Sequence, residues 1–358
     1  MRGLTAPLDP QLGQERPLRI LIATDAWTPQ VNGVVRTLET LRSELLRMGH
    51  DVRMITPELF STVPMPTYPE IKLAIFPGSK VRRIMNAYGA DTVHIATEGP
   101  IGLAVRRYCR LRGIRFTTSF HTRFPEYVHA RFGVPTSWSY AALRWFHNPS
   151  SAVMVATHSL KDELHARGFF NLRLWSRGVD VELFKPRPKD CLDLPRPIWL
   201  YVGRVAVEKN VESFLALDLP GTKLIIGDGP MLTELKVKFP AAHFTGPKFG
   251  EELARYYSAS DVFVFPSKTD TFGLVILEAL ASGIPVAAYP VQGPLDVIGE
   301  APVGALDEDL ARACARALTV SGADAREFAM NFSWEACTRQ FLSNLSPQRP
   351  EAATVPGP

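Results

Sequence analysis

Short apolar runs alternate with amphipathic stretches through the first half of the chain. The uninterrupted runs are typical of strands buried on both faces, and the stretches between them repeat their apolar residues at helical spacing. The expected strands are 18–25, 51–57, 92–97, 114–121 and 152–157, and the clearest helices are 33–50 and 102–113. Strand–helix–strand alternation of this kind predicts a parallel, doubly wound α/β sheet.

The alternation stops at a proline-rich, charged stretch, FKPRPKDCLDLPRP at 184–197, and then begins again. We therefore expect a linker there and a second α/β domain after it. The expected strands are 198–203, 222–230, 242–246, 261–267 and 285–290, with helices near 208–217, at 249–259 and at 272–282. A last amphipathic pattern predicts one terminal helix over 325–345, and the tail 346–358 is expected to be disordered.

The composition is that of a soluble globular protein, with 46% hydrophobic and 21% charged residues. A length of 358 residues favours two domains over one. The four cysteines form no CxxC pair, which favours a reducing compartment over a disulfide framework or a zinc site. No apolar run approaches the ~20 residues that span a bilayer, and the N-terminus lacks an apolar signal core, so we expect a cytoplasmic protein.

Charge is distributed unevenly. Residues 1–186 contain 24 Lys and Arg against 15 Asp and Glu, which gives +9, and the remainder contain 16 against 21, which gives −5 and a total of +4. A basic first half could meet an anionic membrane, nucleic acid or an anionic substrate, or could simply be solvated. No recognised nucleic-acid motif is present, so a nucleic-acid partner is not expected.

Ligands of open α/β sheets bind at the carboxyl ends of the strands, so the residues that follow each strand are the first candidates. Gly33 begins a helix after the first strand, where bare backbone amides can approach a phosphate, although an ordinary turn would have the same sequence. No GxGxxG is present, which disfavours an NAD oxidoreductase. Arg204 and Lys209 follow the first strand of the second domain and could neutralise a diphosphate. Gly227, in IIGDGP, exposes backbone groups suited to a base pocket.

The stretch SKTDTFGLVILEALASGIPV, 267–286, is apolar but contains two acids. Asp270 precedes the expected helix and could accept hydrogen bonds from sugar hydroxyls. Glu278 lies inside the helix and could accept hydrogen bonds from two ribose hydroxyls. An unpaired acid buried in so apolar a helix would cost roughly several kcal/mol, so Glu278 is not expected to be simply buried. Gly273 lies at the first turn, where free amides and the macrodipole favour a phosphate. Helix capping by Asp270 and simple solvation of Glu278 are the alternatives.

The segment DTFGLVILEALASG, 270–283, resembles the acid–seven residues–Glu motif of retaining GT-B glycosyltransferases of the large family 4 type. Further segments match that family in order, and the resemblance extends over about 18–345. These segments are TPQVNGVVRT (28–37), HIATEGPIGLAVRRY (94–108), TSFHTRFPEY (118–127), SRGVDVELFKP (176–186), GRVAVEKN (203–210), IIGDGP (225–230) and ASDVFVFPS (259–267). The pattern is most similar to the lipid-directed subgroup near sulfoquinovosyl and glycosyl diacylglycerol synthases and related mannosyltransferases. The family usually has Glu where this chain has Asp270, which we interpret as tuning of the contact with the donor sugar.

The resemblance implies two Rossmann-like domains facing each other across a cleft, with a C-terminal helix crossing back to the first domain. The implied boundaries are 1–186 with the helix 327–345 for the acceptor and membrane side, and 187–326 for the nucleotide sugar. Its implied catalytic residues are His121, Arg204, Lys209 and Asp270. Its implied donor-binding residues are Gly33, Gly227, Phe244, Thr245, Thr271, Phe272, Gly273, Leu274 and Glu278. No cofactor or metal is expected, since no DxD-type motif is seen and the cations and helix starts would stabilise the leaving diphosphate.

The segment 123–148 mixes aromatic residues with Arg, among them Trp138, Tyr140, Arg144, Trp145 and Phe146, as at a membrane interface. Together with the basic residues Lys80, Arg82 and Arg83, expected in a short loop, it suggests peripheral attachment to the inner face of the cytoplasmic membrane and a lipid acceptor; a core helix pair is the alternative.

We expect a UDP-sugar donor. The alternatives are a GDP-mannose-dependent or other transferase acting on a soluble acceptor, and a non-catalytic nucleotide-sugar-binding protein, which the intact His121, Arg204, Lys209 and Glu278 disfavour.

Overall fold

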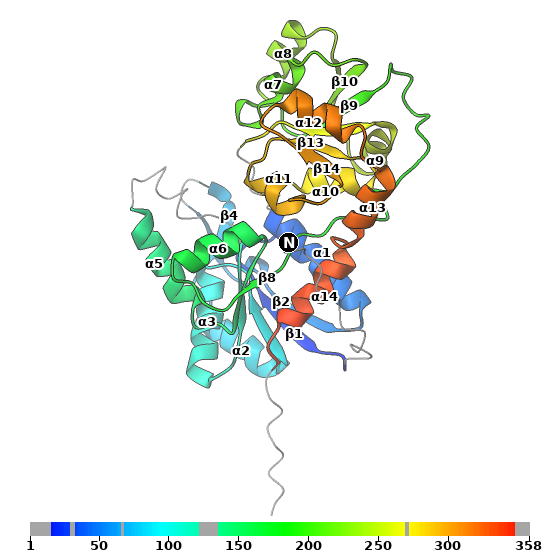
Figure 1. Cartoon of the computed structure of the whole chain (residues 1–358). Helices are drawn as coiled ribbons and strands as arrows, with labels where there is room; N and C mark the ends of the chain where they lie inside the picture. Colours follow the sequence, from blue (N-terminus) through cyan, green and yellow to red (C-terminus); the bar gives the residue numbers. More distant parts are fainter. Residues whose placement is uncertain (1–15, 29–32, 66–67, 122–134, 269–271, 348–358) are drawn as a thin grey trace, which may run out of the picture. The chain divides into compact units, whose positions relative to one another are not determined.

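The computed structural model describes residues 16–28, 33–65, 68–121, 135–268 and 272–347 (Figure 1). Internal packing divides the chain into two compact units, Met1–Val153 with Leu345–Pro358, and Met154–Asn344. The boundaries implied for the two domains, at 186/187 and 326/327, stay a prediction. No helix among the described residues is both long enough and apolar enough to cross a membrane.

A six-stranded sheet, counted over the described residues, has the order β2-β1-β5-β6-β7-β8. Its strands are β1 (Arg19–Ala23), β2 (Asp51–Ile55), β5 (Thr92–Ile95), β6 (Thr117–Phe120), β7 (Ala152–Val155) and β8 (Leu172–Leu174). The helices along this part of the chain are α1 (Gly33–Arg47), α2 (Gly78–Tyr88), α3 (Pro100–Arg112), α5 (Thr136–His147) and α6 (His158–Ala166), and β3 (Thr62–Met65) and β4 (Tyr68–Ala74) form a hairpin. Apolar residues of α2 and α3 pack against β1 and β5. β1 pairs in parallel with β2 and β5, and β5 pairs in parallel with β6, so these buried runs form parallel strands as predicted.

A second six-stranded sheet, again within the described part of the chain, has the order β11-β10-β9-β12-β13-β14 and parallel pairing. Its strands are β9 (Ile198–Val202), β10 (Thr222–Ile226), β11 (His243–Gly246), β12 (Val262–Phe265), β13 (Val286–Ala288) and β14 (Gly304–Leu306). The helices are α7 (Val211–Leu215), α8 (Leu232–Lys238), α9 (Gly250–Ala259), α10 (Leu274–Ala281), α11 (Gln292–Val297), α12 (Leu310–Ala317), α13 (Gly322–Met330) and α14 (Trp334–Asn344).

Alternate residues of this second sheet enter different apolar cores. On β9, Ile198 and Leu200 pack into one cluster, whereas Trp199 and Tyr201 pack into another. A sheet with a core on each face is the doubly wound arrangement that continuous apolar runs predict. The α/β prediction is therefore confirmed for both sheets.

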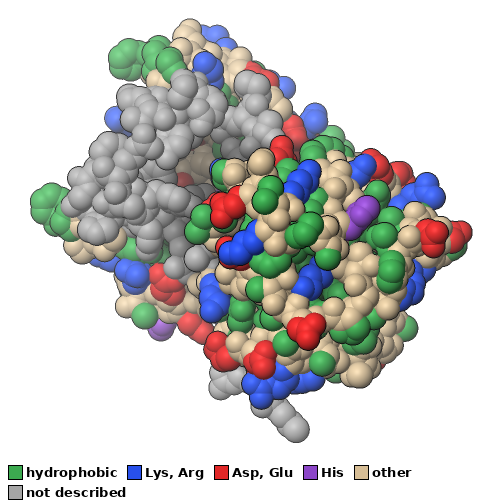
Figure 2. Space-filling view, turned by 90° about the horizontal axis from the view of Figure 1, so that it is seen from above, with side chains coloured by type: hydrophobic (Ala, Val, Ile, Leu, Met, Phe, Trp, Pro, Cys, Tyr) green, Lys and Arg blue, Asp and Glu red, His purple; other side chains and the backbone are tan. Residues whose placement is uncertain are grey.

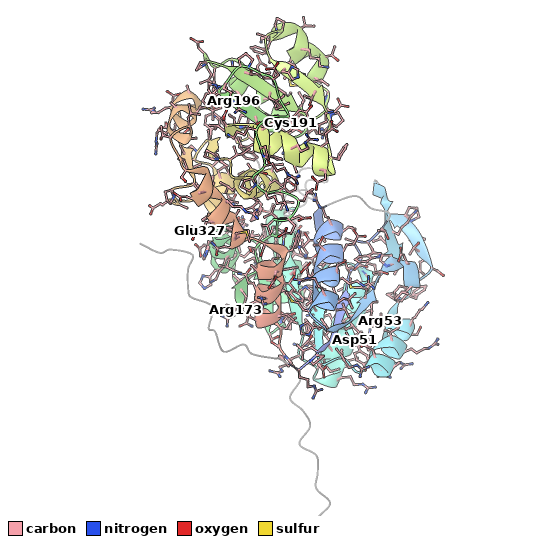
Figure 3. The ribbon with its side chains drawn as sticks, turned by 90° about the vertical axis from the view of Figure 1, so that its right-hand side faces the viewer. Asp51, Arg53, Arg173, Cys191, Arg196 and Glu327 are labelled. Atoms are coloured by element: carbon pink, nitrogen blue, oxygen red, sulfur yellow. The ribbon has the colours of Figure 1, made fainter. Side chains whose placement is uncertain are left out.

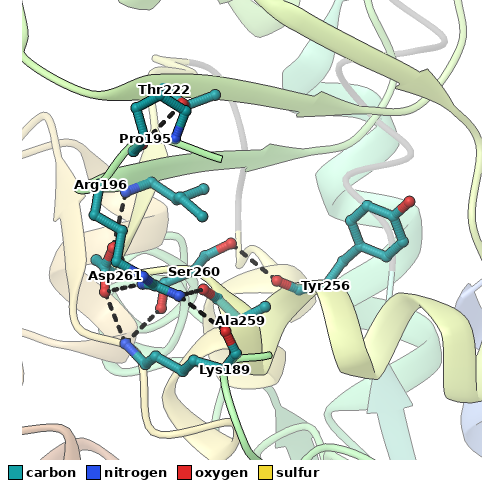
Figure 4. Close-up of polar contacts among 9 residues, drawn as sticks. Lys189, Pro195, Arg196, Thr222, Tyr256, Ala259, Ser260 and Asp261 are labelled. Carbon is teal, nitrogen blue, oxygen red and sulfur yellow. Dashed lines mark hydrogen bonds and ion pairs between the residues drawn. The ribbon is translucent and has the colours of Figure 1, made fainter. Parts of the chain in front are cut away.

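The predicted linker is tied to the second unit by an ion-pair cluster (Figure 4). Arg196 donates to both oxygens of Asp261 at 2.6 and 2.7 Å, and Lys189 Nζ donates to Asp261 Oδ1 at 2.8 Å. The Ile198 amide donates to Asp261 Oδ2 at 2.8 Å. Burial alone would raise the pKa of Asp261, but the hydrogen bond from Lys189 and these other partners hold the pKa below its ordinary value. Asp261 thus joins the end of the linker to the start of β12.

The C-terminal prediction needs a correction. The single helix expected over 325–345 is two helices, α13 and α14, with a break at 331–333. Phe332 O accepts a hydrogen bond from the Val179 amide at 2.8 Å, and Val179 forms a bridge with Ser333. Because backbone groups in the break pair with a distant segment, the helix ends where its sequence pattern continues.

The edge strands of the first sheet have charged, exposed residues. Asp51 and Arg53 lie on β2 and Arg173 lies on β8 (Figure 3). Charges on such strands discourage pairing with another chain. On the face shown in Figure 2, acidic and basic side chains are interspersed among scattered apolar ones over the described surface.

Candidate functional site

The loops after β9 and β10 approach each other so closely that glycine is required between them. The Gly203 amide donates to Ile226 O at 3.0 Å and the Val205 amide donates to Asp228 O at 2.9 Å. Gly227 has φ +144°, and a Cβ placed on it would lie 1.9 Å from Gly203 O. The predicted turn at IIGDGP is therefore a backbone-lined surface at the carboxyl edge of the second sheet.

Gly227 is joined to the next strand end. Its amide donates to Gly246 O at 3.1 Å, which brings the end of β11 beside the end of β10. Phe244 and Thr245 both lie on β11 and are half-buried. The structure thus places the three residues expected near the base on two neighbouring strands.

Arg204 and Lys209 lie on the loop after β9. Arg204 is held by its backbone, because Tyr201 donates its hydroxyl to Arg204 O at 2.8 Å, while its side chain is 65% exposed and 3.7 Å from the Glu208 carboxylate. Such an exposed, long ion pair is weak and leaves the guanidinium accessible to an anionic ligand. Lys209 ends a short 3-10 turn, Val207–Lys209, so it precedes the helix α7 instead of beginning it.

The same loop is joined to the end of β12. Asn210, with φ +52°, donates its side-chain amide to Pro266 O at 3.1 Å. This bond connects the segment with the two cations to the segment that leads into α10. Arg204, Lys209 and the approach to α10 consequently share one edge of the second sheet.

The helix α10 begins two residues later than the sequence pattern suggests. Its N-cap is Gly273 in the left-handed region, with φ +80° and no side-chain cap, and Leu274 is its first residue. Phe272 is half-buried and packs against the core instead of extending the helix. The amides of the first turn therefore keep the capacity to bind an anion. Asp270 and Thr271 lie outside the described residues.

Glu278 is oriented by a buried tyrosine. Tyr257 on α9 donates its hydroxyl to Glu278 Oε2 at 3.0 Å. Burial, followed by the charge of Glu278, raises the pKa of the Tyr257 phenol well above its ordinary value, so the phenol stays protonated and donates. Glu278 is thus a half-buried carboxylate with a fixed partner and not a simply solvated helix residue.

The sequence analysis missed two further residues at this edge. Lys268 follows β12, Tyr289 follows β13, and the Lys268 ammonium lies 4.3 Å from the centre of the Tyr289 ring. A cation over an aromatic face is attracted electrostatically, which keeps this charge close to the two strand ends. Lys268 comes directly after the predicted strand 261–267, which was the available signal, whereas Tyr289 lies within the predicted strand 285–290.

In the first unit, Gly33 begins α1 as expected, and its carbonyl accepts the Thr37 hydroxyl at 2.7 Å. His121 directly follows β6 and is half-buried. Residues 29–32 and 122–134, which adjoin these two positions, lie outside the described residues. Both predicted residues thus lie at carboxyl ends of the first sheet or at the helix start that follows one.

Asp25, which follows β1, was also missed. Its carboxylate accepts from the Ile101 amide at 2.9 Å and from the Gly102 amide at 3.2 Å, so it caps the start of α3. Burial raises the pKa of Asp25 to about 6, although hydrogen bonds from Ile101, Gly102 and Thr97 oppose the rise. A titratable group near neutral pH at a ligand-binding edge is typical of functional sites, although capping alone also accounts for it.

No group of three His, Cys, Asp or Glu side chains suited to a metal ion occurs among the residues that the structure describes. Independence from a metal stays a prediction, because Asp270 and its neighbours are not among them.

Comparison with known proteins gives two family models in succession. Glycosyltransferase Family 4 matches residues 31–183, and Glycosyl transferases group 1 matches residues 196–320. A GDP-mannose-dependent alpha-mannosyltransferase of Mycobacterium tuberculosis is 30% identical over 309 residues, which are 78% of this chain and 81% of that protein. Sulfoquinovosyl transferase SQD2 of Arabidopsis thaliana is 29% identical over 331 residues, 83% of this chain and 64% of that protein. Alpha-monoglucosyldiacylglycerol synthase of Streptococcus pneumoniae is 28% identical over 346 residues, 84% of this chain and 78% of that protein.

Solved structures agree on the fold. Sucrose-phosphate synthase from Thermosynechococcus elongatus superposes with a TM-score of 0.66 at 23% identity, covering 91% of this chain and 98% of that one. Anabaena HepE in complex with UDP and glucose superposes with a TM-score of 0.61 at 15% identity, with the same coverage of 91% and 98%. With the two parallel sheets, these likenesses confirm the predicted GT-B fold.

Proposed function

The chain belongs to glycosyltransferase family 4, and from that membership we propose that it transfers a sugar from a nucleotide diphosphate sugar to a membrane lipid, with retention of configuration. A UDP-sugar is the favoured donor and diacylglycerol the model acceptor. The activity class, a hexosyltransferase, follows from the family; the donor, the stereochemistry and the acceptor are the proposal. The observation that carries it is the gathering of Arg204, Lys209 and the uncapped start of α10 at one edge of the second sheet.

That edge suits a departing diphosphate. Breaking the sugar–phosphate bond builds negative charge on the phosphate and positive charge on the sugar. Arg204 provides an exposed guanidinium, Lys209 a second cation, and the first turn of α10 amides with the positive end of the helix dipole. Fixed donors of this kind contribute about 3 kcal/mol each to stabilising developing charge. The proposed reaction places the acceptor on the face of the sugar from which the phosphate leaves.

The nucleotide is assigned to the neighbouring strand ends. Glu278, fixed by Tyr257, is the proposed acceptor of the ribose hydroxyls. Gly227, Phe244 and Thr245 surround the proposed base position at the ends of β10 and β11. Asp270, Thr271 and His121 keep their proposed roles toward the donor sugar.

A lipid acceptor is supported by the surface of the first unit. On α5, Trp138 is 72% exposed and Trp145 is 59% exposed. Arg106 on α3 stacks 3.8 Å from the Trp145 ring centre and donates to Phe146 O at 3.0 Å, so the exposed indole has a fixed support. Exposed aromatics on a rigid helix are typical of proteins that bind at a membrane interface.

Basic residues accompany these tryptophans in the same unit. Lys80, Arg82 and Arg83 are exposed, but they lie on helix α2 and not in the loop that the sequence suggested. We propose that they and the tryptophans attach the protein peripherally to the inner face of the cytoplasmic membrane. The relative from Streptococcus pneumoniae is named a glucosyldiacylglycerol synthase, which supports the same proposal.

A second candidate is a GDP-mannose-dependent transferase with a soluble acceptor. The relative with 30% identity is named a GDP-mannose-dependent alpha-mannosyltransferase, and the acidic Glu278 would serve the ribose of either nucleotide. Thermal-shift measurements with UDP, GDP, UDP-glucose and GDP-mannose separate the donors, since a ligand at 100 times its dissociation constant stabilises by ~2.7 kcal/mol. Transfer of labelled sugar to dioleoylglycerol, but not to methyl α-mannoside, supports the lipid proposal. The reverse result supports the second candidate, and an absence of stabilisation by all four ligands contradicts both.

A further inference from the structure

A carboxylate that was not predicted from the sequence lies at the carboxyl edge of the first sheet. Glu98 follows β5, and His121 follows β6, its neighbour in the sheet. The Glu98 side chain is 32% exposed, and one of its oxygens, Oε1, lies 3.1 Å from Nε2 of the fully buried His147. Glu98 is therefore anchored through one oxygen while its carboxylate keeps an exposed surface at the carboxyl edge of the sheet.

His147 is held on its other side by a chain of hydroxyl groups. Ser150 donates its hydroxyl to Ala152 O at 3.1 Å, and Thr118 donates its hydroxyl to Ser150 Oγ at 3.3 Å. Thr118 Oγ1 also lies 2.9 Å from His147 Nδ1.

Both ring nitrogens of His147 therefore have a polar partner, Thr118 Oγ1 at Nδ1 and Glu98 Oε1 at Nε2. Because the ring is fully buried, the position of the Glu98 oxygen that it contacts is fixed from the interior of the unit.

A second buried histidine shows what a purely structural role looks like here. His94 on β5 contacts two hydroxyls, with Nδ1 2.9 Å from Thr117 Oγ1 and Nε2 2.9 Å from Ser119 Oγ. Burial lowers the pKa of His94 to about 3, so this ring stays neutral. The carboxylate partner is what distinguishes His147 from His94.

A second acid lies beside this pair. The Asp25 carboxylate is so close to the backbone before α3 that a Cβ on Gly99 would lie 2.4 Å from Asp25 Cγ. The charge of Glu98 is among the causes that raise the pKa of Asp25, after burial. Two acids at one strand edge favour hydroxyl donors and repel phosphate groups.

Building on the proposed transferase function, we propose that Glu98 is an acceptor-binding residue that takes a hydrogen bond from the acceptor's hydroxyl, and that His147 is the positioning residue that holds it. The acceptor class that fits is an uncharged, hydroxyl-bearing headgroup, because Glu98 would repel an anionic headgroup. Sugar transfer then requires no further reactant. The acceptor's hydroxyl donates its hydrogen bond to Glu98 in the bound state, and the sugar comes from the donor.

The kinetic test compares Glu98→Gln, which keeps the shape and removes the charge, with Glu163→Gln, a half-buried glutamate that pairs with Arg167 on the exposed face of α6. Acceptors are dioleoylglycerol and phosphatidylinositol in phosphatidylcholine–phosphatidylserine vesicles, and soluble methyl α-mannoside, each with UDP-glucose and GDP-mannose. Glu98→Gln should lower kcat/KM for the preferred acceptor at least ten-fold and reduce the preference for dioleoylglycerol over phosphatidylinositol. Binding of UDP or GDP should stay within two-fold of the wild type, as should all parameters of Glu163→Gln. An acceptor kcat/KM within two-fold of the wild type would overturn the proposal.

The positioning role has its own test. His147→Asn keeps a donor for Thr118 but has no atom at the Nε2 position, so it should lower the acceptor kcat/KM at least five-fold. His94→Asn should lower the melting temperature without that kinetic change; equal kinetic losses in both variants would contradict a specific role for His147. In ¹⁵N spectra of histidine-labelled protein, the Nε2 resonance of His147 should shift in Glu98→Gln and stay unchanged in Glu163→Gln.

The spectra test the contact independently of any turnover. If the wild type transfers sugar to none of the three acceptors, the proposed lipid transferase is wrong, while an Nε2 resonance that depends on Glu98 still supports the pair. An Nε2 resonance that is the same in Glu98→Gln and the wild type would overturn the pair whatever the kinetics show.

Discussion

The hydroxyl of Tyr257 on α9 donates to Glu278 Oε2 on α10 at 3.0 Å. Tyr257 is fully buried between the sheet and these helices, so the bond has little freedom. Glu278 lies four residues into α10, about 6 Å along the helix from its start at a rise of 1.5 Å per residue. One buried hydroxyl therefore sets the position of the carboxylate that we assign to the ribose.

Tyr257→Phe removes that hydroxyl without changing the ring. The Glu278 carboxylate should lose its fixed orientation, and UDP or GDP should bind about 5- to 15-fold more weakly, which corresponds to roughly 1–1.5 kcal/mol for one hydrogen bond to a charged group. Isothermal titration calorimetry measures the change. Tyr256→Phe is the matched control, because Tyr256 lies on the same helix and its ring contact with Lys248 survives the substitution. Equal affinities of Tyr257→Phe and the wild type would remove the ribose assignment.

Arg204→Ala should act mainly on turnover. Among the described residues, the Arg204 guanidinium has only a long contact to Glu208, so its loss should leave the folded structure stable and remove charge stabilisation of the leaving diphosphate. We expect kcat to fall by roughly 100-fold or more, with KM for the donor changing much less. Steady-state kinetics with saturating acceptor measure both. Arg255→Ala removes an exposed arginine from α9 and should change neither, and a fall in donor affinity alone for Arg204→Ala would contradict the assignment.

Gly227 allows a direct test of the strand-end packing. An alanine there would place its Cβ 1.9 Å from Gly203 O, and its φ of +144° is unfavourable for any side chain. Gly227→Ala should lower the free energy of unfolding by roughly 2–5 kcal/mol, the sum of backbone strain and overpacking. Gly246→Ala is the control for strain alone, because Gly246 has φ +75° but an added Cβ meets nothing within 4 Å. Urea unfolding that gives the same loss for both variants would show that the contact between the two loops relaxes freely.

The two exposed tryptophans of α5 test the membrane proposal. Replacing Trp138 and Trp145 with alanine should reduce binding to phosphatidylcholine–phosphatidylserine vesicles at least ten-fold, since each indole loses apolar contact with the interface. Sedimentation with vesicles measures the bound fraction at low and high salt. Phe249→Ala removes a side chain that is 77% exposed in the second unit and should leave binding unchanged. Binding that depends neither on the tryptophans nor on salt would show that this surface does not meet the membrane.

Strand ends were the part of the site that the sequence could predict. Arg204, Glu278 and Gly227 each follow a recognisable apolar run, and the rule that ligands bind at carboxyl edges is independent of how the strands are ordered. The residues that were missed depend on that order. His147 lies 49 residues after Glu98, and the two meet only because β5, β6 and β7 are neighbours in the sheet.

The errors in the predicted elements have the same origin. The apolar pattern of 325–345 is helical throughout, but the chain breaks at Phe332, whose carbonyl pairs with Val179, and Ser333 Oγ then caps α14 by accepting from the Ala336 amide at 3.1 Å. Likewise, Phe272 continues the apolar pattern of α10 but packs into the core, so the helix starts at Leu274. In both places a long-range contact decides the element boundary over the local preference.

Asp25 predicts a pH dependence of stability. Its pKa is about 6 in the folded protein because of burial, against an ordinary value of 3.8, so the folded state binds more protons than the unfolded state between these values. The contribution of Asp25 to stability is therefore largest below about pH 4 and falls as the pH rises to about 6, by up to about 3 kcal/mol for a shift of this size. Thermal or urea unfolding across this range should show a downward slope that Asp25→Asn removes, whatever its effect on absolute stability. Asp193→Asn, at an exposed position, should keep the slope of the wild type. If Asp25→Asn and the wild type have parallel curves from pH 4 to 6, Asp25 stays ionised in the folded protein, and the amides of Ile101 and Gly102 stabilise its charge more than burial destabilises it.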